Sequence, residues 1–374
     1  MKGKDMTKLT KITLAMIASL SLLGTAYAGE VTVTGNAEAT YSITGSKTGT
    51  SVDDTATVMG KGIGVANEID FTATGETDNG YTWKYQTQFD DGSAVDDGRL
   101  EVTSPFGTLG LYVSEGSLGK HYGWDVSSYG VGSDQGITTG AEINGIEASD
   151  YNNIQYHIPS GILPFGITAK VAYAPNGATG QTKAASVRGQ GAMAHIAEAT
   201  SYQVTAAPID GLELGASYAE ATYNGGVAAT KYQPENGSLY ATYAVGPATF
   251  GYGKTYIQPR VGARAAATDI TNEARKYENT SYGIGVAVND QLSVSFTTEE
   301  FELTEVDIDA GTDAETSATP VINVDTIQAS YNVGGMTVAI GHAEADEISY
   351  NGDNGTANDE HDNTQTFISI KMAF

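Results

Sequence analysis

The last eleven residues of the chain, Thr364–Phe374, alternate between apolar and polar positions. One side of this segment carries Ile368, Ile370, Met372 and Phe374, and the other side carries Ser369 and Lys371. A period of two predicts a β-strand with one apolar face and one polar face. The apolar face fits either the core of a soluble sandwich or the lipid around a membrane barrel with a wet interior.

The same pattern repeats along the chain, and no segment with helical periodicity longer than a turn or two follows residue 28. Short turns rich in Gly, Asn, Asp and Pro separate alternating segments at 77–80, 104–107, 159–166, 208–211, 245–247, 289–291 and 334–335. Such residues supply the positive backbone angles that hairpins need. Long polar segments lie at 45–58, 90–98, 116–150, 176–199, 224–235, 259–276, 307–321 and 351–363.

These seven turns and eight long segments alternate strictly, which predicts sixteen antiparallel strands. We therefore predict an all-β fold, a 16-stranded antiparallel transmembrane β-barrel with short periplasmic turns and long extracellular loops. A soluble sandwich has no reason to separate short from long connections in this way, and sixteen strands is large for one.

The strands have one polar or charged phase, which we assign to the barrel interior. In Tyr81–Phe89, for example, the aromatic residues alternate with Thr82, Lys84, Gln86 and Gln88. A barrel of sixteen strands is too wide for side chains to fill, so the lumen is expected to hold water. The predicted pore-lining residues of the wall are Glu68, Asp70, Lys84, Arg99, Glu101, Tyr112 and Lys170.

The first strand, Glu30–Ile43, departs from this pattern because small residues follow Val31 and Val33 on the outward phase. Gly35, Ala37 and Ala39 suit close packing against another protein surface, and this predicts a subunit interface. The alternative is a locally thin apolar band.

The amino terminus has the features of a secretory signal peptide. Basic residues precede the apolar stretch Ile12–Leu23, and Ala26-Tyr27-Ala28 has small residues at both cleavage-determining positions. The twelve apolar residues are too few for a membrane anchor. We predict a signal peptide at 1–28, starting at Met1 or Met6 and using the Sec pathway, and a barrel domain at 29–374.

The charge is strongly acidic, with 45 Asp and Glu against 19 Lys and Arg and a net charge of −26. This balance excludes non-specific nucleic-acid binding as a main role. It favours attraction of cations, although an acidic surface that keeps the protein soluble explains the same count. The chain has no cysteine, so no disulfide stabilises it.

The sequence carries no sign of an enzyme. It has no Gly-x-Ser-x-Gly motif, and its five histidines are scattered without the spacing of metal ligands. The segment 351–360 is rich in oxygen ligands but lacks the spacing of a calcium loop. We predict no catalytic residue, no metal site and no cofactor.

Taken together, the sequence resembles the general porin family of Gram-negative outer membranes. The resemblance rests on the signal peptide, the ordered turns and loops, the terminal Phe374, and the stretch Pro105–Leu111, which is similar to that family's turn before the constriction loop. It implies location in the outer membrane, a homotrimer, contact with lipid and lipopolysaccharide, and recognition of Phe374 by the barrel-assembly machinery as an assembly signal.

The resemblance also implies that the third long loop, approximately 116–150, folds into the barrel and narrows it. Its charged residues would then face basic residues of the wall, and the resulting transverse field would orient polar solutes. The predicted constriction-loop residues are Lys120, Asp125, Asp134, Glu142 and Glu147.

The function this predicts is passive diffusion of ions and small hydrophilic solutes through a water-filled channel that prefers cations. Two alternatives stay open. One is a channel selective for a particular substrate, and the other is a structural or adhesive outer-membrane barrel.

Overall fold

The computed structural model describes residues 26–49, 57–90, 97–113, 115–119, 137, 139, 141, 145–175, 196–223, 230–262, 270–308, 313–317, 321–350 and 360–374. In these parts the chain is nearly all β, with three single turns of 3-10 helix at Ala148–Asp150, Pro164–Gly166 and Ile348–Tyr350. No helix within the described residues is long and apolar enough to cross a membrane.

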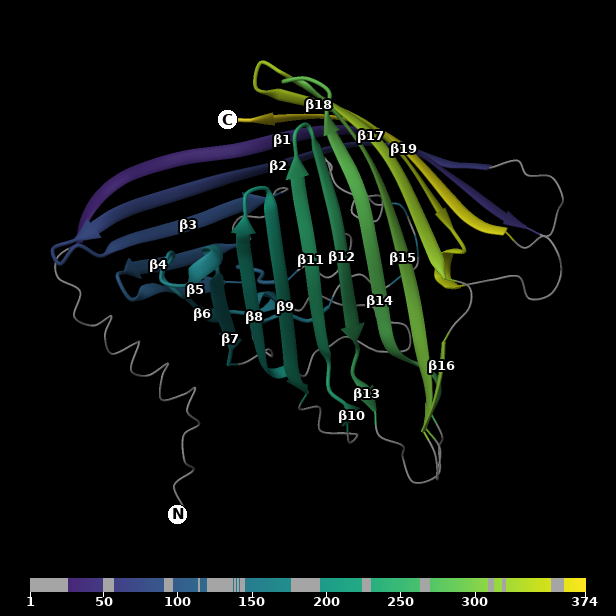
Figure 1. Ribbon diagram of the computed structural model, residues 1–374, viewed down its shortest axis with the longest axis horizontal. Coiled ribbons are helices and arrows are strands. Elements are labelled where there is room, and N and C mark those ends of the chain that lie inside the picture. Colours follow the sequence, from purple (N-terminus) through teal and green to yellow (C-terminus); the bar gives the residue numbers. More distant parts are fainter. Residues whose placement is uncertain are drawn as a thin grey trace, which may run out of the picture.

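Sixteen strands close into one antiparallel barrel (Figure 1), as the alternation of the sequence predicts. Each pairs with its neighbours along the chain, and β1 pairs with both β2 and β19, which closes the ring. The barrel strands are β1 (Ala26–Gly49), β2 (Thr57–Thr77), β3 (Thr82–Asp90), β4 (Gly98–Ser104), β5 (Gly107–Val113), β6 (Asn153–His157), β7 (Thr168–Ala174), β8 (Ile196–Ile209), β9 (Leu212–Tyr223), β11 (Glu235–Val245), β12 (Ala248–Gln258), β14 (Ile270–Ala287), β15 (Leu292–Ile308), β17 (Ile322–Val333), β18 (Met336–Asp346) and β19 (Glu360–Ala373).

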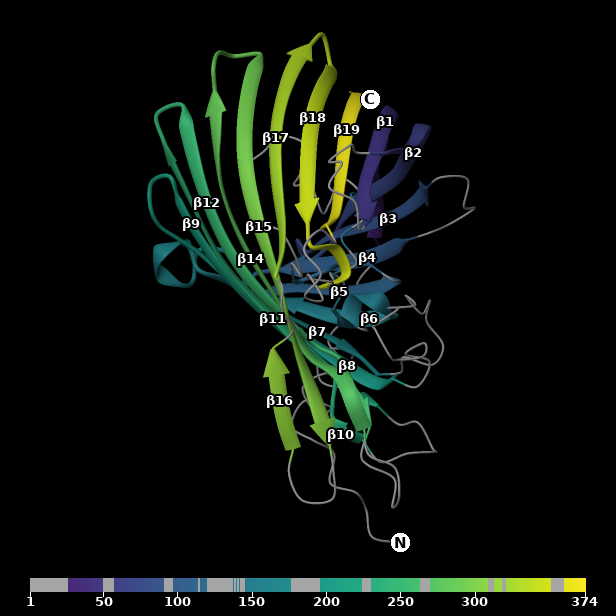
Figure 2. The ribbon, with the colours of Figure 1, turned by 90° about the vertical axis from the view of Figure 1, so that its right-hand side faces the viewer.

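Three further strands lie in segments that the sequence predicts to be loops, and this corrects the boundaries given above. They are β10 (Thr230–Tyr232), β13 (Val261–Gly262) and β16 (Asp313–Ser317). In Figure 2, β10 and β16 lie at the lower end of the barrel, where the neighbouring barrel strands end. β10 pairs with β13, and β16 pairs with the carboxyl-terminal end of β15, from Thr304 to Ile308.

These extensions are ordered because they bury a small apolar core of their own. Val261, Val306 and Ile308 are almost fully buried there, with Tyr232 packed against them. The Arg275 guanidinium lies 4.0 Å from the centre of the Tyr232 ring. Strand pairing beyond the barrel rim therefore depends on contacts between loops, which the periodicity of a single strand does not reveal.

The outward face of the barrel carries the apolar phase of the strands. In β19, Ile368, Ile370 and Met372 are all exposed, while Ser369 between them is fully buried. This agrees with the predicted assignment of the terminal strand, whose apolar face is turned away from the barrel interior.

The inward face is polar over much of its surface but not everywhere, so the prediction of a wholly polar interior is wrong. An apolar cluster on the loop side of β12–β18 includes Tyr277, Phe301, Leu303 and Ile322. Phe301 and Leu303 share the inward phase of β15 with the buried Thr297 and Glu299. Ile137, from the third long loop, and Tyr350, which follows β18, belong to the same buried cluster and pack with this patch.

The barrel closes at the carboxyl terminus. The N–H of Gly35 donates to the carbonyl of Phe374 at 2.8 Å, and the N–H of Phe374 donates to the carbonyl of Gly35 at 2.9 Å. A Cβ on residue 35 would lie 2.9 Å from the Phe374 ring and 2.5 Å from the Glu68 carbonyl oxygen. Because Gly35 has no side chain, the Phe374 ring can pack against β1 at the point where the first and last strands of the barrel meet.

Candidate functional site on the inner wall

Charged residues gather on the inner face of β2, β3 and β4. Arg99 and Glu101 belong to the inward phase of β4, and the register places them opposite Gln86 and Lys84 of β3. Glu68 and Asp70 of β2 lie opposite Asp90 and Gln88 of β3. Because side chains directly opposite on one face of antiparallel strands lie about 5 Å apart at Cβ, these groups form one continuous polar wall.

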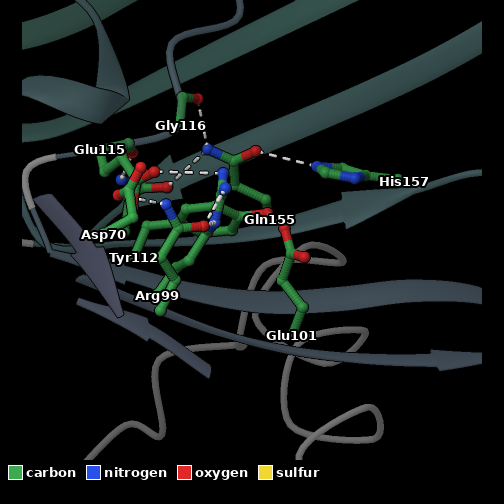
Figure 3. A network of polar contacts seen from close by, with 10 residues as sticks. Asp70, Arg99, Glu101, Tyr112, Glu115, Gly116, Gln155 and His157 are labelled. Atoms are coloured by element: carbon green, nitrogen blue, oxygen red, sulfur yellow. Dashed lines mark hydrogen bonds and ion pairs between the residues drawn. The ribbon is translucent and has the colours of Figure 1, made fainter. Parts of the chain in front are cut away.

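A chain of polar contacts runs across this wall from Asp70 to Glu115 (Figure 3). Gln86 Nε2 donates to Asp70 at 2.6 Å, and Arg99 Nε donates to Gln86 Oε1 at 3.0 Å. Arg99 Nη2 also donates to the same oxygen, and Nη1 lies 3.1 Å from a Glu115 carboxylate oxygen. These contacts tie the guanidinium to the wall, and the chain of contacts has a carboxylate at each end.

Tyr112 forms a hydrogen bond with Glu101, the neighbouring acid on the wall. Its hydroxyl donates to Glu101 at 2.5 Å, and its ring lies over Gly110, where a Cβ would be 2.3 Å from a ring carbon. The side chain faces inward but is only 3% exposed. Tyr112 thus fixes the direction of the Glu101 carboxylate and contributes little open surface.

The first residues of the third long loop are tied to the wall beside this chain. Gln155 Nε2 of β6 donates to the carbonyl of Gly116 at 2.6 Å, and its Oε1 lies 2.9 Å from His157 Nε2 (Figure 3). Gln203 Nε2 of β8 donates to the carbonyl of Leu118 at 2.6 Å. These bonds direct the chain after β5 across the inner wall.

The last residues of the same loop return to the same wall. Glu147 is 3% exposed and accepts hydrogen bonds from Ser117 at 2.6 Å and Ser149 at 2.8 Å. The N–H of Ala148 donates to Ser201 Oγ of β8 at 2.9 Å. Glu147 therefore joins the two ends of the loop, a structural contact that its predicted role in the constriction did not include.

Between these ends, the loop reaches the opposite side of the barrel. Leu118 and Ile146 pack with Ala172 and Ile196 on β7 and β8. Ile137 packs with Phe301 and its neighbours on the far wall. The described parts of the loop thus contact two separate parts of the inner wall, which is consistent with a loop folded into the barrel.

The structure brings some predicted residues together and leaves others apart. Asp70 and Arg99 join one network and Glu101 and Tyr112 pair beside it, whereas Lys170 lies on β7 opposite His157 and Gln203. Glu68 and Lys84 face the same interior from β2 and β3. Lys120, Asp125, Asp134 and Glu142 lie outside the described residues.

Several inward-facing charges were missed by the sequence-based assignment. Glu38 of β1 lies opposite Lys371 of β19, and it accepts a hydrogen bond from Ser369 at 2.6 Å. Asp90 continues the inward phase of Gln86 and Gln88, and this periodicity is a signal that could have identified it. Glu115 follows the end of β5, so alternation gives it no assignment.

The described inner wall carries a surplus of acids. The acids include Glu38, Glu68, Asp70, Asp90, Glu101, Glu115 and Glu299, and the bases include Lys84, Arg99, Lys170 and Lys371. Burial raises the pKa of Glu115, and the opposing attraction of Arg99 does not fully offset this. Within the described residues, no group of three or more His, Cys, Asp or Glu side chains could hold a metal ion.

Comparisons with known proteins identify a family. The family described as Gram-negative porin matches residues 13–319. No curated protein matches the chain.

Solved structures share the fold at low sequence identity. The anion-selective porin from Comamonas acidovorans is 14% identical with a TM-score of 0.57, and the match covers 92% of this chain and 100% of that one. Outer-membrane expressed OmpT of Vibrio cholerae is 13% identical with a TM-score of 0.57, covering 94% and 100%. OmpF of Salmonella typhi, in complex with daunomycin, is 13% identical with a TM-score of 0.56, covering 93% and 100%.

Proposed function

The chain belongs to the Gram-negative porin family and forms an outer-membrane channel, and from this premise we propose that it lets ions and small hydrophilic solutes diffuse passively, with a preference for cations. The observation that carries the preference is the surplus of carboxylates on the inner face of β1–β4. A lumen lined by one sign of charge concentrates ions of the opposite sign.

The fold itself does not set the preference. One structural neighbour is an anion-selective porin, and it shares this barrel fold at 14% identity. The side chains of this chain therefore set its selectivity. Arg99 is held between Gln86 and Glu115, so its charge is partly balanced on the wall itself.

The direct test is the zero-current potential of the purified protein in planar bilayers across a potassium chloride gradient. We expect open channels whose potential has the sign of a cation preference. A potential of the opposite sign would contradict the preference, and protein that inserts without conductance would contradict passive diffusion.

Acidification is expected to weaken the cation preference, beginning above the ordinary glutamate pKa of about 4.3. Because the pKa of Glu115 is raised, this carboxylate takes up its proton at a higher pH than an ordinary glutamate during a downward titration. The lumen then loses one negative charge, and Arg99 loses its counter-ion. The permeability ratio should be measured from pH 8 to pH 4.

The matched variant for this titration is Glu115→Gln, which is uncharged at every pH. Its cation preference should be lower than that of the parent at pH 8, and the first step of the acid titration should be missing. An unchanged titration in Glu115→Gln would show that other groups cause the response.

We further propose that the chain is exported through the Sec pathway, cleaved after Ala28, inserted by the barrel-assembly machinery and assembled as a homotrimer in contact with lipid and lipopolysaccharide. The outward face of β1 and β2 supports a subunit interface there. Val31, Val33, Ile63 and Val65 are each more than half exposed, beside the small Ala37 and Ala39. A second copy packed on this face would cover those side chains.

A further inference from the structure

A cavity of about 410 Å³ lies beside the first residues of β1, at the end of the barrel with the short turns. It is lined by Gly29 of β1, Thr74–Glu76 of β2, Thr82–Lys84 of β3 and Thr103 of β4. Two of these residues are glycines and three are threonines, so little side-chain volume fills the space.

The β1–β2 ladder is interrupted at this cavity. Pairing is continuous from Val31, opposite Ala73, as far as Thr44, but the register shifts between Ala28 and Val31. Gly29 falls in the break and lies against β2, where a Cβ would be 2.7 Å from the Thr74 carbonyl oxygen. Any larger residue at position 29 would have to displace the backbone of β2.

The predicted cleavage site coincides with this break. Hydrolysis of the Ala28–Gly29 peptide bond consumes one water and leaves a carboxylate on Ala28 of the released leader and an ammonium group on Gly29. It also removes Tyr27 and Ala28, which pair with Glu76 and Gly75 in the described chain. The new ammonium group would then line the cavity and require an opposite charge or hydrogen-bond acceptors.

Glu76 is placed to meet that requirement. Its carboxylate is exposed, and it has no ion-pair partner among the described residues. Ala28 lies opposite Gly75 in the ladder, at a Cα separation of about 5 Å, so the nitrogen of Gly29 is within reach of a glutamate side chain at the next position. Lys84 is the basic residue of the cavity lining. Its positive charge is also close enough to Glu115 to offset part of the rise that burial causes in the pKa of that carboxyl group.

We propose that this cavity seats the amino terminus of the mature chain and that the Glu76 carboxylate is the counter-ion of the Gly29 ammonium group. The proposal rests on the export and cleavage described under the proposed function. The ion pair ties the free end of β1 to β2 at the point where cleavage removes the strand pairing. Hydroxyl groups of Thr74 and Thr82 offer additional acceptors.

The test uses mature protein purified from the outer membrane and begins with its intact mass and amino-terminal sequence. A start at a residue other than Gly29 would reject the cleavage site, and with it the proposal. Once the start at Gly29 is established, an amine-reactive reagent is applied across a pH series, and the labelled amino-terminal peptide is quantified separately from the lysines.

An adjacent carboxylate stabilises the charged form of an amine. The pKa of a free amino terminus is ordinarily about 7.7–8.0, and we expect the pKa of the Gly29 amine to be higher by about one pH unit. Labelling of Gly29 at pH 7 should therefore be about tenfold slower in the parent than in Glu76→Gln. Asp290→Asn is the matched control, because it makes the same carboxylate-to-amide change in the short turn between β14 and β15. Its labelling rate should equal that of the parent.

Equal labelling of the parent and Glu76→Gln, with the start at Gly29, would overturn the proposal. A second measurement avoids dependence on the variant, because the parent labelled in denaturant loses the ion pair and should react about as fast as Glu76→Gln. Equal rates for folded and denatured parent would likewise overturn it. Conductance of the same preparations tests the channel separately.

Discussion

Replacing Gly35 by valine is expected to eliminate most of the folded barrel. Gly35 and Phe374 exchange two backbone hydrogen bonds of 2.8 and 2.9 Å, which close the seam between β1 and the carboxyl terminus. A Cβ at residue 35 would approach the Glu68 carbonyl oxygen to 2.5 Å and the Phe374 ring to 2.9 Å. Overpacking by one methyl group costs about 1–3 kcal/mol, and valine adds two more carbons.

The measurement is the fraction of protein extracted from the outer membrane that migrates as folded barrel on a gel without heating. Gly35→Ala should lower this fraction and Gly35→Val should lower it much further. Ala216→Val is the control, because Ala216 lies on the outward phase of β9, opposite the exposed Val204, and is itself exposed. A normal yield of folded Gly35→Val would show that the seam tolerates a side chain.

Phe374→Ala is expected to lower the yield as well, since it removes both the ring at the seam and the proposed assembly signal. A double-mutant cycle separates these two roles. If the Phe374 ring packs on Gly35, then Gly35→Ala should reduce the yield of folded barrel less in the Phe374→Ala background. In that background the new methyl group has no ring to contact. Strictly additive losses would favour a role of Phe374 in assembly alone.

Neutralising two carboxylates of the wall, in the variant Glu68→Gln/Asp70→Asn, is expected to reduce the cation preference strongly. A unit charge about 8 Å from an ion in water changes the ion's energy by about 0.5 kcal/mol. Cations and anions shift in opposite directions, so each charge changes the permeability ratio by about fivefold at low salt. The effect decreases as screening increases, because the Debye length is about 10 Å at 0.1 M.

The permeability ratio of this variant should be compared at low and high salt with that of a variant whose charges are removed from the outward face. Glu300 and Glu302 belong to the outward phase of β15, so Glu300→Gln/Glu302→Gln removes the same charge from outside the lumen. Arg99→Gln should change selectivity in the opposite direction, towards a stronger cation preference. An equal response to the inner and outer pairs would show that overall charge, and not the lumen, sets the selectivity.

The sequence alone determined the barrel and the side of the wall on which most of its charges lie. Successive side chains of a strand point to opposite faces, so the phase that places Leu100 outward necessarily places Arg99 and Glu101 inward. The alternation of short turns with long segments then fixed the strand order. These conclusions required only the backbone period and the turn residues.

Tertiary structure decided which of those residues meet. Asp70 and Arg99 are linked through Gln86 because of the register between strands, and Glu115 joins them because the loop after β5 turns along the wall. No periodicity constrains a loop, so the sequence could not identify Glu115 or the structural role of Glu147. The order of charges along one strand follows from the sequence of that strand alone. Contacts between charges on different strands depend on the register in which those strands pair.

The apolar patch inside the barrel was likewise decided by the tertiary structure. Phe301 and Leu303 follow the alternation of β15, but their phase points inward, where Ile137 of a loop more than 160 residues earlier in the chain covers them. Alternation specifies two faces for each strand, and it cannot specify what packs against either face. That depends on free energy gained by burying apolar surface between distant segments, which exists only once the barrel has closed.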